Sequence, residues 1–188
     1  VIGSDTRQAF RLLPSGKEAW QAYDVIILGD VDPNRLGTAA LNDLTTAVDP
    51  IDATGRGLVL VAGDKHMPRA YGETPLARLV PLAIGEVTPG GVSDPEGFQV
   101  SPTPAGNAFG PLILAARASE NPNTFAKLAP LYWSLGPVRT KPVAQVLATT
   151  SRDGSPAILY ATIGSGRVVL QLVDATWRWR YQVGNEYF

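Results

Sequence analysis

Residues 164–174 read GSGRVVLQLVD, a glycine-rich turn followed by an apolar run and an aspartate. A short apolar run between turn residues is typical of a strand buried on both faces, as in the parallel sheets of α/β proteins. Two earlier stretches have a similar form, YDVIILGDVD at residues 23–32 and GLVLVAGD at residues 57–64. The sequence therefore predicts three buried parallel strands, each ending close to an aspartate.

The segments between the predicted strands favour helices. Apolar residues recur at helical spacing between residues 40 and 48, and Pro50 ends that helix. A strand, a helix and a second strand in this order form a βαβ unit, whose crossover is expected to be right-handed. Pro75–Val80 predicts a short helix, and Asn123 is a candidate cap for another that carries Phe125 and extends toward Leu131.

The second half of the chain changes character twice. Glycine and proline are so frequent over residues 85–111 that irregular surface backbone is expected there. Val143–Thr149 and Ala157–Ile163 then flank Asp153-Gly154, a strong signal for a tight hairpin. The predicted fold is a three-layer α/β/α sandwich with a mostly parallel sheet and an antiparallel C-terminal extension. We expect residues 1–188 to be a single domain and a fragment of a longer protein.

Composition narrows the classes of function. The chain has 45% hydrophobic and 18% charged residues and a formal net charge of −1, which favours neither nucleic acid nor an anionic membrane surface. It has no cysteine, which excludes disulfides, thiolate metal sites and a cysteine nucleophile. The composition fits a cytoplasmic and a periplasmic location equally. Neither a metal site nor a cofactor site is expected, because histidine pairs at metal-binding spacing are absent.

Acidic residues follow each of the three predicted strands: Asp30 and Asp32, then Asp64, then Asp174. Because ligands of open α/β sheets bind beyond the carboxyl ends of the strands, we expect these carboxylates to point toward one rim. They form a cation site or an acid/base pair in one interpretation. In the other, which we favour, each caps the turn or helix that follows. His66, the only histidine, is a further candidate acid/base group beside Asp64.

The Asp30-Val31-Asp32 stretch resembles the first motif of haloacid-dehalogenase-type phosphatases, whose two acids hold magnesium. That family also needs a later lysine and an acidic pair after another strand. Lys65 is misplaced directly after Asp64, and the chain contains no Asp-Asp pair. A motif this short without its context is weak support for phosphatase chemistry.

The densest group of aromatic and cationic residues is Trp177-Arg178-Trp179-Arg180. If this segment is extended, alternation places both indoles on one side and both guanidinium groups on the other. All four are candidate ligand-binding residues, together with Asp30 and Asp32, because Trp and Arg dominate interface hot spots. The favoured alternative is that the indoles pack against the sheet.

These blocks together resemble the class I glutamine amidotransferase-like domains, most closely those of large bacterial proteins, often planctomycete, beside von Willebrand factor A domains. The most specific part is Asp174-x-Thr176-Trp177-Arg178-Trp179-Arg180. The resemblance implies a flavodoxin-like fold. In true glutamine amidotransferases a cysteine follows the middle strand and a histidine follows the last, and these positions look like Asp64 and Asp174 here. Glutaminase chemistry needs a thiolate and an imidazole, so the resemblance implies the fold without that reaction.

The leading prediction is a non-catalytic amidotransferase-like module of a larger, envelope-associated bacterial protein. Its expected partners are other domains of the same protein or a separate protein, without nucleic acid and without membrane contact of its own. The alternative is a carboxylate-based hydrolase of carbohydrates or phosphate esters. That enzyme would use Asp64 with Asp174 or His66, or a metal held by Asp30 and Asp32.

Overall fold

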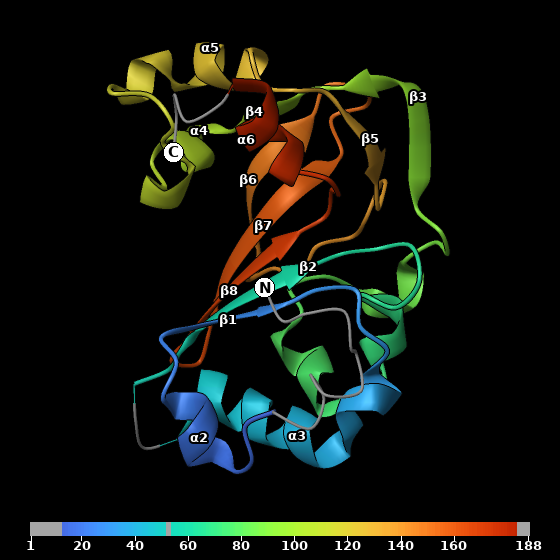
Figure 1. The fold of residues 1–188 in the computed structure, drawn as a ribbon, viewed down its shortest axis with the longest axis vertical. Coiled ribbons are helices and arrows are strands. Elements are labelled where there is room, and N and C mark those ends of the chain that lie inside the picture. Colours follow the sequence, from blue (N-terminus) through green and yellow to red (C-terminus); the bar gives the residue numbers. More distant parts are fainter. Residues whose placement is uncertain (1–12, 52–53, 184–188) are drawn as a thin grey trace.

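The computed structural model describes residues 13–51 and 54–183. Its strands are β1 (Val25–Leu28), β2 (Gly57–Val61), β3 (Val92–Phe98), β4 (Val100–Pro102), β5 (Leu131–Ser134), β6 (Gln145–Thr150), β7 (Pro156–Ile163) and β8 (Gly166–Gln171). Six of them form one sheet in the order β1-β2-β8-β7-β6-β4, and β3 pairs with β5 in a second, two-stranded sheet (Figure 1). The protein is therefore of the α/β class, as predicted.

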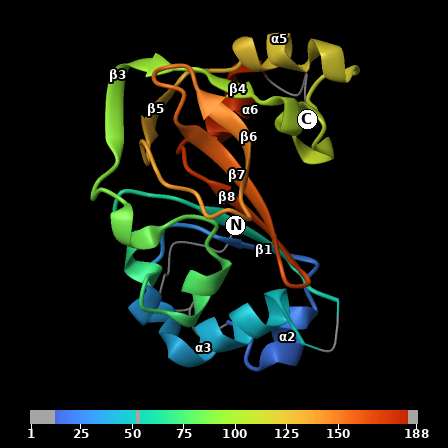
Figure 2. The same cartoon turned by 180° about the vertical axis from the view of Figure 1, so that it is seen from behind.

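Helices lie in two groups at opposite ends of the molecule (Figures 1 and 2). The α-helices are α2 (Lys17–Gln21), α3 (Pro33–Val48), α4 (Pro104–Asn107), α5 (Asn121–Ala126) and α6 (Trp177–Val183). The 3-10 helices are η1 (Arg69–Tyr71), η2 (Pro75–Leu79), η3 (Ile84–Glu86), η4 (Gly110–Leu112) and η5 (Ala118–Glu120). Helices α2 and α3 lie beside β1 and β2, whereas α4, α5 and α6 lie near β4 and β6. Among the described helices, none combines the length and hydropathy needed to cross a bilayer.

The large sheet is mixed, so the prediction of a mostly parallel sheet was wrong. Strands β1, β2 and β8 are parallel, but β7 is antiparallel to both β8 and β6, and β4 is antiparallel to β6. Short connections explain why β7 is antiparallel to both of its neighbours, since a turn of a few residues can join only antiparallel strands. The loop at Arg152–Gly154 and the turn at Gly164–Ser165 are both of this kind. The antiparallel extension therefore makes up half of the sheet.

Two hydrophobic cores follow from alternation along the strands. Leu58 and Leu60 of β2, with Val168 and Leu170 of β8, belong to the core that contains the buried face of α3. A second core contains Ile158 together with Phe125 of α5 and Trp179 of α6. Side chains of successive strand residues point to opposite faces of the sheet. The sheet can therefore bury one set of apolar side chains against α3 and the other set against α5 and α6.

Residues 85–111 are more ordered than the glycine and proline content suggests. They contain β3 and β4, and the side chains of Phe98 and Val100 lie in the second core. Helix α5 also begins at Asn121 rather than after Asn123, and Leu131 begins a strand instead of extending the helix. The amide of Asn121 is fully buried and bridges Leu114 N, Leu112 O and another side chain, which ties the preceding loop to the helix.

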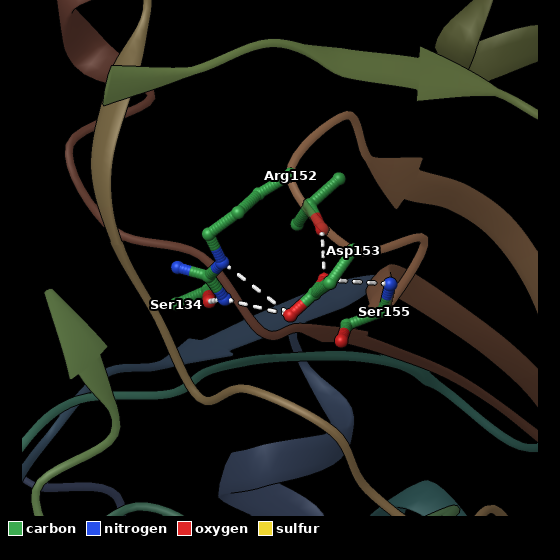
Figure 3. Close-up of polar contacts among 5 residues, drawn as sticks. Ser134, Arg152, Asp153 and Ser155 are labelled. Carbon is green, nitrogen blue, oxygen red and sulfur yellow. Dashed lines mark hydrogen bonds and ion pairs between the residues drawn. The ribbon is translucent and has the colours of Figure 1, made fainter. Parts of the chain in front are cut away.

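The loop between β6 and β7 links the two sheets through a cluster of polar side chains (Figure 3). Asp153 accepts hydrogen bonds from Thr150 Oγ1 at 2.8 Å and from Ser155 N at 3.0 Å. Hydrogen bonds from Ser155 hold the pKa of the Asp153 carboxyl well below its usual range. Burial acts in the opposite direction, but its effect is smaller. Arg152 pairs with Asp153 and also donates to Ser134 Oγ of β5 at 3.0 Å. The loop therefore holds β5 in place.

Candidate functional site

A cavity of about 420 Å³ opens at the carboxyl ends of the parallel strands β2 and β8. Its lining comes from several distant segments: the loop after β1, the end of β2 and the loop after it, the loop before β3, β3 itself, β5, and Asp174. The side chains that line it and are used below are Asp30, Asp64, Ser93, Trp133 and Asp174. We refer to this space as the rim cavity.

Three of the four strand-end aspartates meet in the rim cavity, as parallel pairing of their strands predicts. These three are Asp30, Asp64 and Asp174. Asp32 lies outside it and instead accepts a hydrogen bond from Asn34 N at 2.9 Å as the cap of α3. His66 lines a separate, much smaller hollow beside the rim cavity. The prediction that Asp32 joins a rim of acids was therefore wrong, and its capping alternative is confirmed.

Asp30 is committed to backbone hydrogen bonds. One of its carboxylate oxygens accepts from His66 N at 2.7 Å and from Met67 N at 2.6 Å. The other accepts from Lys65 N at 3.1 Å. Charged hydrogen bonds of this kind are about twice as strong as neutral ones. A single side chain after β1 therefore fixes the loop that follows β2.

The packing and ionisation of Asp30 agree with this structural role. A Cβ atom added at Gly63 would lie 2.3 Å from Asp30 Cγ, so the approach of the two segments requires glycine at position 63. Burial by itself would raise the pKa of the Asp30 carboxyl. The three amide hydrogen bonds, helped by a smaller electrostatic contribution from His66, outweigh burial and hold that pKa below its ordinary value of 3.8. Asp30 is therefore charged at neutral pH.

Asp64 occupies the turn after β2 but lacks the setting of a nucleophile. Nucleophile elbows hold their residue in a strained turn that runs directly into an α-helix. Among the described non-glycine residues, Asp64 is not one with positive φ, and the loop leads into the short 3-10 helices η1 and η2. The side chain of Asp64 is exposed at the mouth of the rim cavity. It is presented to solvent rather than to a catalytic partner.

Asp174 stands at the end of β8 beside the one described non-glycine residue with positive φ, Ala175 at 59°. The carboxylate of Asp174 is exposed and accepts a hydrogen bond from Ala175 N. Left-handed backbone costs a residue with a Cβ roughly 1–2 kcal/mol, and such strain tends to gather at functional sites. The backbone is therefore strained at Ala175, between Asp174 at the rim cavity and the start of α6.

Changing Ala175 to glycine is expected to raise the free energy of unfolding by about 1 kcal/mol, because glycine adopts positive φ without steric cost. Urea denaturation at pH 7 measures the change. A matched Ala→Gly change at Ala47, which lies inside α3, is expected to destabilise the protein instead. Equal destabilisation by both changes would contradict the strain at Ala175.

Trp133 forms an aromatic wall of the rim cavity. Its indole Nε1 donates to Gly90 O at 2.9 Å, and a Cβ atom at Gly91 would lie 2.5 Å from the ring. The next residue, Ser134, is the one that Arg152 holds. Trp133 and Ser93 could not be expected at the cavity from the sequence. They come from the second sheet, whose strand β3 lies in the Gly- and Pro-rich segment. The adjacent aromatic residues Tyr132 and Trp133 in a short strand-like run were the available signal.

The Trp177–Arg180 segment is helical, so the alternation that an extended chain would show does not apply to it. Trp179 is 8% exposed, lies edge-on to Phe125 at 6.0 Å between ring centroids, and donates from Nε1 to Ala129 O at 3.0 Å. Trp177 is 64% exposed, and Arg178 stacks over the ring of Tyr132. None of these four residues lines the rim cavity. One indole is therefore core and the other is surface.

The described residues contain no group of three or more His, Cys, Asp or Glu side chains arranged to hold a metal ion. In the same part of the chain, neither Asp64 nor Asp174 forms an ion pair with a cationic side chain. The rim cavity therefore presents two uncompensated carboxylates beside an indole. Such a surface attracts positive charge and repels phosphates and other anions.

Comparison with known proteins establishes the fold alone. No protein-family profile matches the chain, and no curated protein matches it. The structure is similar to that of the cytoplasmic protein STM1381 from Salmonella typhimurium LT2, with a TM-score of 0.65 and 20% identity over 94% of this chain and 72% of that one. It is also similar to the cytoplasmic protein STM3548 from Salmonella typhimurium, with a TM-score of 0.64 and 18% identity over 92% and 69% of the two chains.

Proposed function

We propose that this chain is a non-catalytic, class I glutamine amidotransferase-like domain that binds a positively charged group of a protein partner in the rim cavity. The partner is another domain of the same protein or a separate polypeptide that offers a Lys or Arg side chain. The observation that carries the proposal is the set of three backbone hydrogen bonds to Asp30.

Those hydrogen bonds bear on catalysis because acyl-transfer enzymes need backbone N–H groups that are free to stabilise the oxyanion. In elbow hydrolases, the backbone N–H of the residue after the nucleophile stabilises the oxyanion of the tetrahedral intermediate. Here that residue is Lys65, and its N–H already donates to Asp30. The next two amides donate to the same carboxylate. A negative charge therefore occupies the place where a developing oxyanion would need donors.

The ancestral chemistry would also need other side chains at two positions. A carboxylate at Asp64 and another at Asp174 replace the thiolate and the imidazole that glutamine hydrolysis requires. The helices beside both faces of the large sheet support a three-layer, flavodoxin-like arrangement of the domain. In that arrangement the rim cavity occupies the place where open α/β sheets bind their ligands.

The cationic partner follows from the cavity's charge. Among the described residues, Asp64 and Asp174 offer acceptor oxygens that form no ion pair, and Trp133 offers an aromatic face, on which guanidinium and ammonium groups stack favourably. A polypeptide side chain can reach such a cavity from outside. We therefore favour an assembly role over binding of a free anion or a nucleic acid.

Binding of the end-capped tripeptide Gly-Arg-Gly tests this proposal. We expect saturable binding to the wild-type chain by NMR titration, with the indole signal of Trp133 shifting. Asp64→Asn and Asp174→Asn are each expected to weaken binding by about 0.5–1 kcal/mol, roughly a two- to fivefold loss of affinity. The interaction is expected to weaken further as salt is added, because the carboxylates are exposed.

Glu73→Gln provides the matched control, since Glu73 is an exposed acid outside the rim cavity. It is expected to leave the affinity for Gly-Arg-Gly unchanged, and the capped tripeptide Gly-Glu-Gly is expected not to bind. Equal binding of the two tripeptides, or an equal loss in Glu73→Gln and Asp64→Asn, would contradict a cationic ligand.

A carboxylate-based hydrolase is the second candidate, because Asp64 and Asp174 line one open cavity together with an aromatic side chain. Glycoside hydrolases use a pair of carboxylates in the reaction. General acids in such enzymes are usually held in apolar surroundings, whereas both of these side chains are exposed. Release of nitrophenol from aryl glycosides or aryl phosphates, lost in Asp64→Asn, would favour the hydrolase over the binding module.

A further inference from the structure

Strand β5 is joined to the end of β8 at the wall of the rim cavity. Asp174 N donates a hydrogen bond to Trp133 O at 3.4 Å. The residue after Trp133, Ser134, forms an antiparallel bridge with Val173. Two side chains that line the cavity, those of Trp133 and Asp174, are therefore connected through their backbones. A shift of β5 would move both of them.

Ser134 is held from the face of β5 that points away from the cavity. Side chains of successive strand residues point to opposite faces, so Ser134 points away from the side on which Trp133 lines the cavity. The Ser134 side chain is fully buried, and its Oγ accepts a hydrogen bond from Arg152 at 3.0 Å (Figure 3). Arg152 does not line the rim cavity. It can therefore act on a ligand there through the position of β5 rather than by contact.

The guanidinium group of Arg152 is itself fixed on several sides. Its Nε and Nη2 atoms donate to Asp153 at 3.3 and 3.2 Å, and its central carbon lies 5.3 Å from the centre of the Phe98 ring. Asp153 is fixed in turn by two hydrogen bonds from neighbouring residues of the loop. A planar guanidinium fork can donate to Asp153 and to Ser134 at the same time, whereas a lysine offers a point charge on a flexible stem.

This arrangement is costly in two places. Arg152 Nη1 is buried and has no hydrogen-bond partner among the described residues, and a buried donor that lacks an acceptor destabilises the folded state. Ala175, directly after Asp174, has positive φ. One cost therefore lies beside Ser134 and the other beside Asp174. Costs of this kind tend to gather at functional sites, which favours a role for Arg152 beyond stability.

We propose that Arg152 is a positioning residue of the rim cavity, which holds Trp133 and Asp174 in place for the cationic ligand through its hydrogen bond to Ser134. The inference rests on the proposed function, because it assigns the residue that keeps that binding site in shape. Arg152 itself does not touch the ligand. Loss of its hydrogen bond frees β5 to move and lowers the fraction of molecules whose cavity is ready to bind.

The ligand-free protein tests this positioning through the order parameter of the Trp133 indole N–H, measured by ¹⁵N relaxation. In the wild type we expect a value near that of rigid backbone, about 0.85. Ser134→Ala, which removes only the acceptor, and Arg152→Lys, which keeps the charge, are each expected to lower it toward about 0.6. Arg117→Lys makes the same exchange at an exposed arginine that pairs with Glu120 outside the cavity, and is expected to leave the value unchanged.

Affinity for end-capped Gly-Arg-Gly gives a second readout in the same variants. Ser134→Ala and Arg152→Lys are each expected to weaken binding about threefold, and Arg117→Lys is expected to have no effect. The double variant of Ser134 and Arg152 is also expected to lose about threefold, because both changes remove the same hydrogen bond and their effects should not add. If Arg152→Lys does not fold, Ser134→Ala decides the test by both readouts.

An unchanged order parameter of Trp133 in the folded variants would overturn the inference. A double variant that loses about ninefold in affinity would also overturn it, since the two changes would then act independently. Failure of the wild type to bind Gly-Arg-Gly, together with a lowered order parameter in the variants, would contradict the proposed function. That result would still support the hold of Arg152 on Trp133.

Discussion

Replacement of Trp179 by alanine is expected to lower the free energy of unfolding by about 3–5 kcal/mol. Trp179 is 8% exposed and packs edge-on against Phe125 in the second core. Its loss would leave a cavity between α5 and α6, and Ala129 O would lose its hydrogen bond from the indole. Urea denaturation followed by far-UV circular dichroism measures the change.

Trp177→Ala is the matched control in the same helix. Trp177 is 64% exposed, and surface substitutions usually change stability by about 0.5 kcal/mol or less. The two tryptophans are two residues apart, so the same truncation at each separates a core role from a surface role. A loss of several kcal/mol at position 177, or none at position 179, would contradict the helical assignment of α6.

The second large effect is expected at Asp30, whose replacement by alanine should destabilise the protein by about 3 kcal/mol. Hydrogen bonds to a charged group contribute about 1.5–3 kcal/mol each, and three amides would lose their acceptor. Solvent can hydrate part of this exposed loop, so the expected loss is less than the sum. Urea denaturation at pH 7 gives the value.

Asp32→Ala is the control for Asp30→Ala, because Asp32 accepts one amide hydrogen bond as the cap of α3. Loss of a helix cap costs about 1 kcal/mol. A larger effect at Asp32 than at Asp30 would contradict the organising role of the Asp30 carboxylate.

Acid should weaken the wild-type protein for a related reason. The pKa of Asp30 in the folded state lies below its ordinary value of 3.8, so its charge stabilises the protein fully at pH well above 3.8. That contribution is lost as the pH falls from about 4 through the lower pKa of the folded state. Asp30→Ala is therefore expected to lose less stability than the wild type between pH 5 and pH 2, although the lowered pKa values of Asp49 and Asp153 preserve part of the acid sensitivity.

Local sequence patterns predicted the strands that build the rim cavity. Apolar runs bounded by turn residues located β1, β2 and β8, and parallel pairing of those runs brought Asp30, Asp64 and Asp174 to one edge. This worked because buried parallel strands have a strong and purely local signature. The short turns on both sides of β7 were also visible in the sequence. Their consequence, that half of the sheet is antiparallel, was not drawn from them.

The parts that could not be predicted depend on contacts between distant residues. The partners of Asp30 are 35 to 37 positions away, and no spacing rule connects an aspartate after one strand with the amides after another. Trp133 reaches the cavity because β5 pairs with β3, and Pro95 and Gly97 make β3 hard to recognise as a strand from its sequence. The Trp177–Arg180 segment fits both a strand and a helix by composition, and only the packing of Trp179 against α5 distinguishes them.

The central claim is that Asp30 occupies the backbone donors that amidotransferase chemistry would need, which leaves the rim cavity to bind rather than to react. Introducing a nucleophile and an imidazole tests it most directly, in the double variant Asp64→Cys and Asp174→His, with ammonia release from glutamine measured by a coupled assay. We expect no release above background from the wild type or from a double variant with an unchanged circular dichroism spectrum. Sustained ammonia release proportional to the concentration of either protein would contradict the claim.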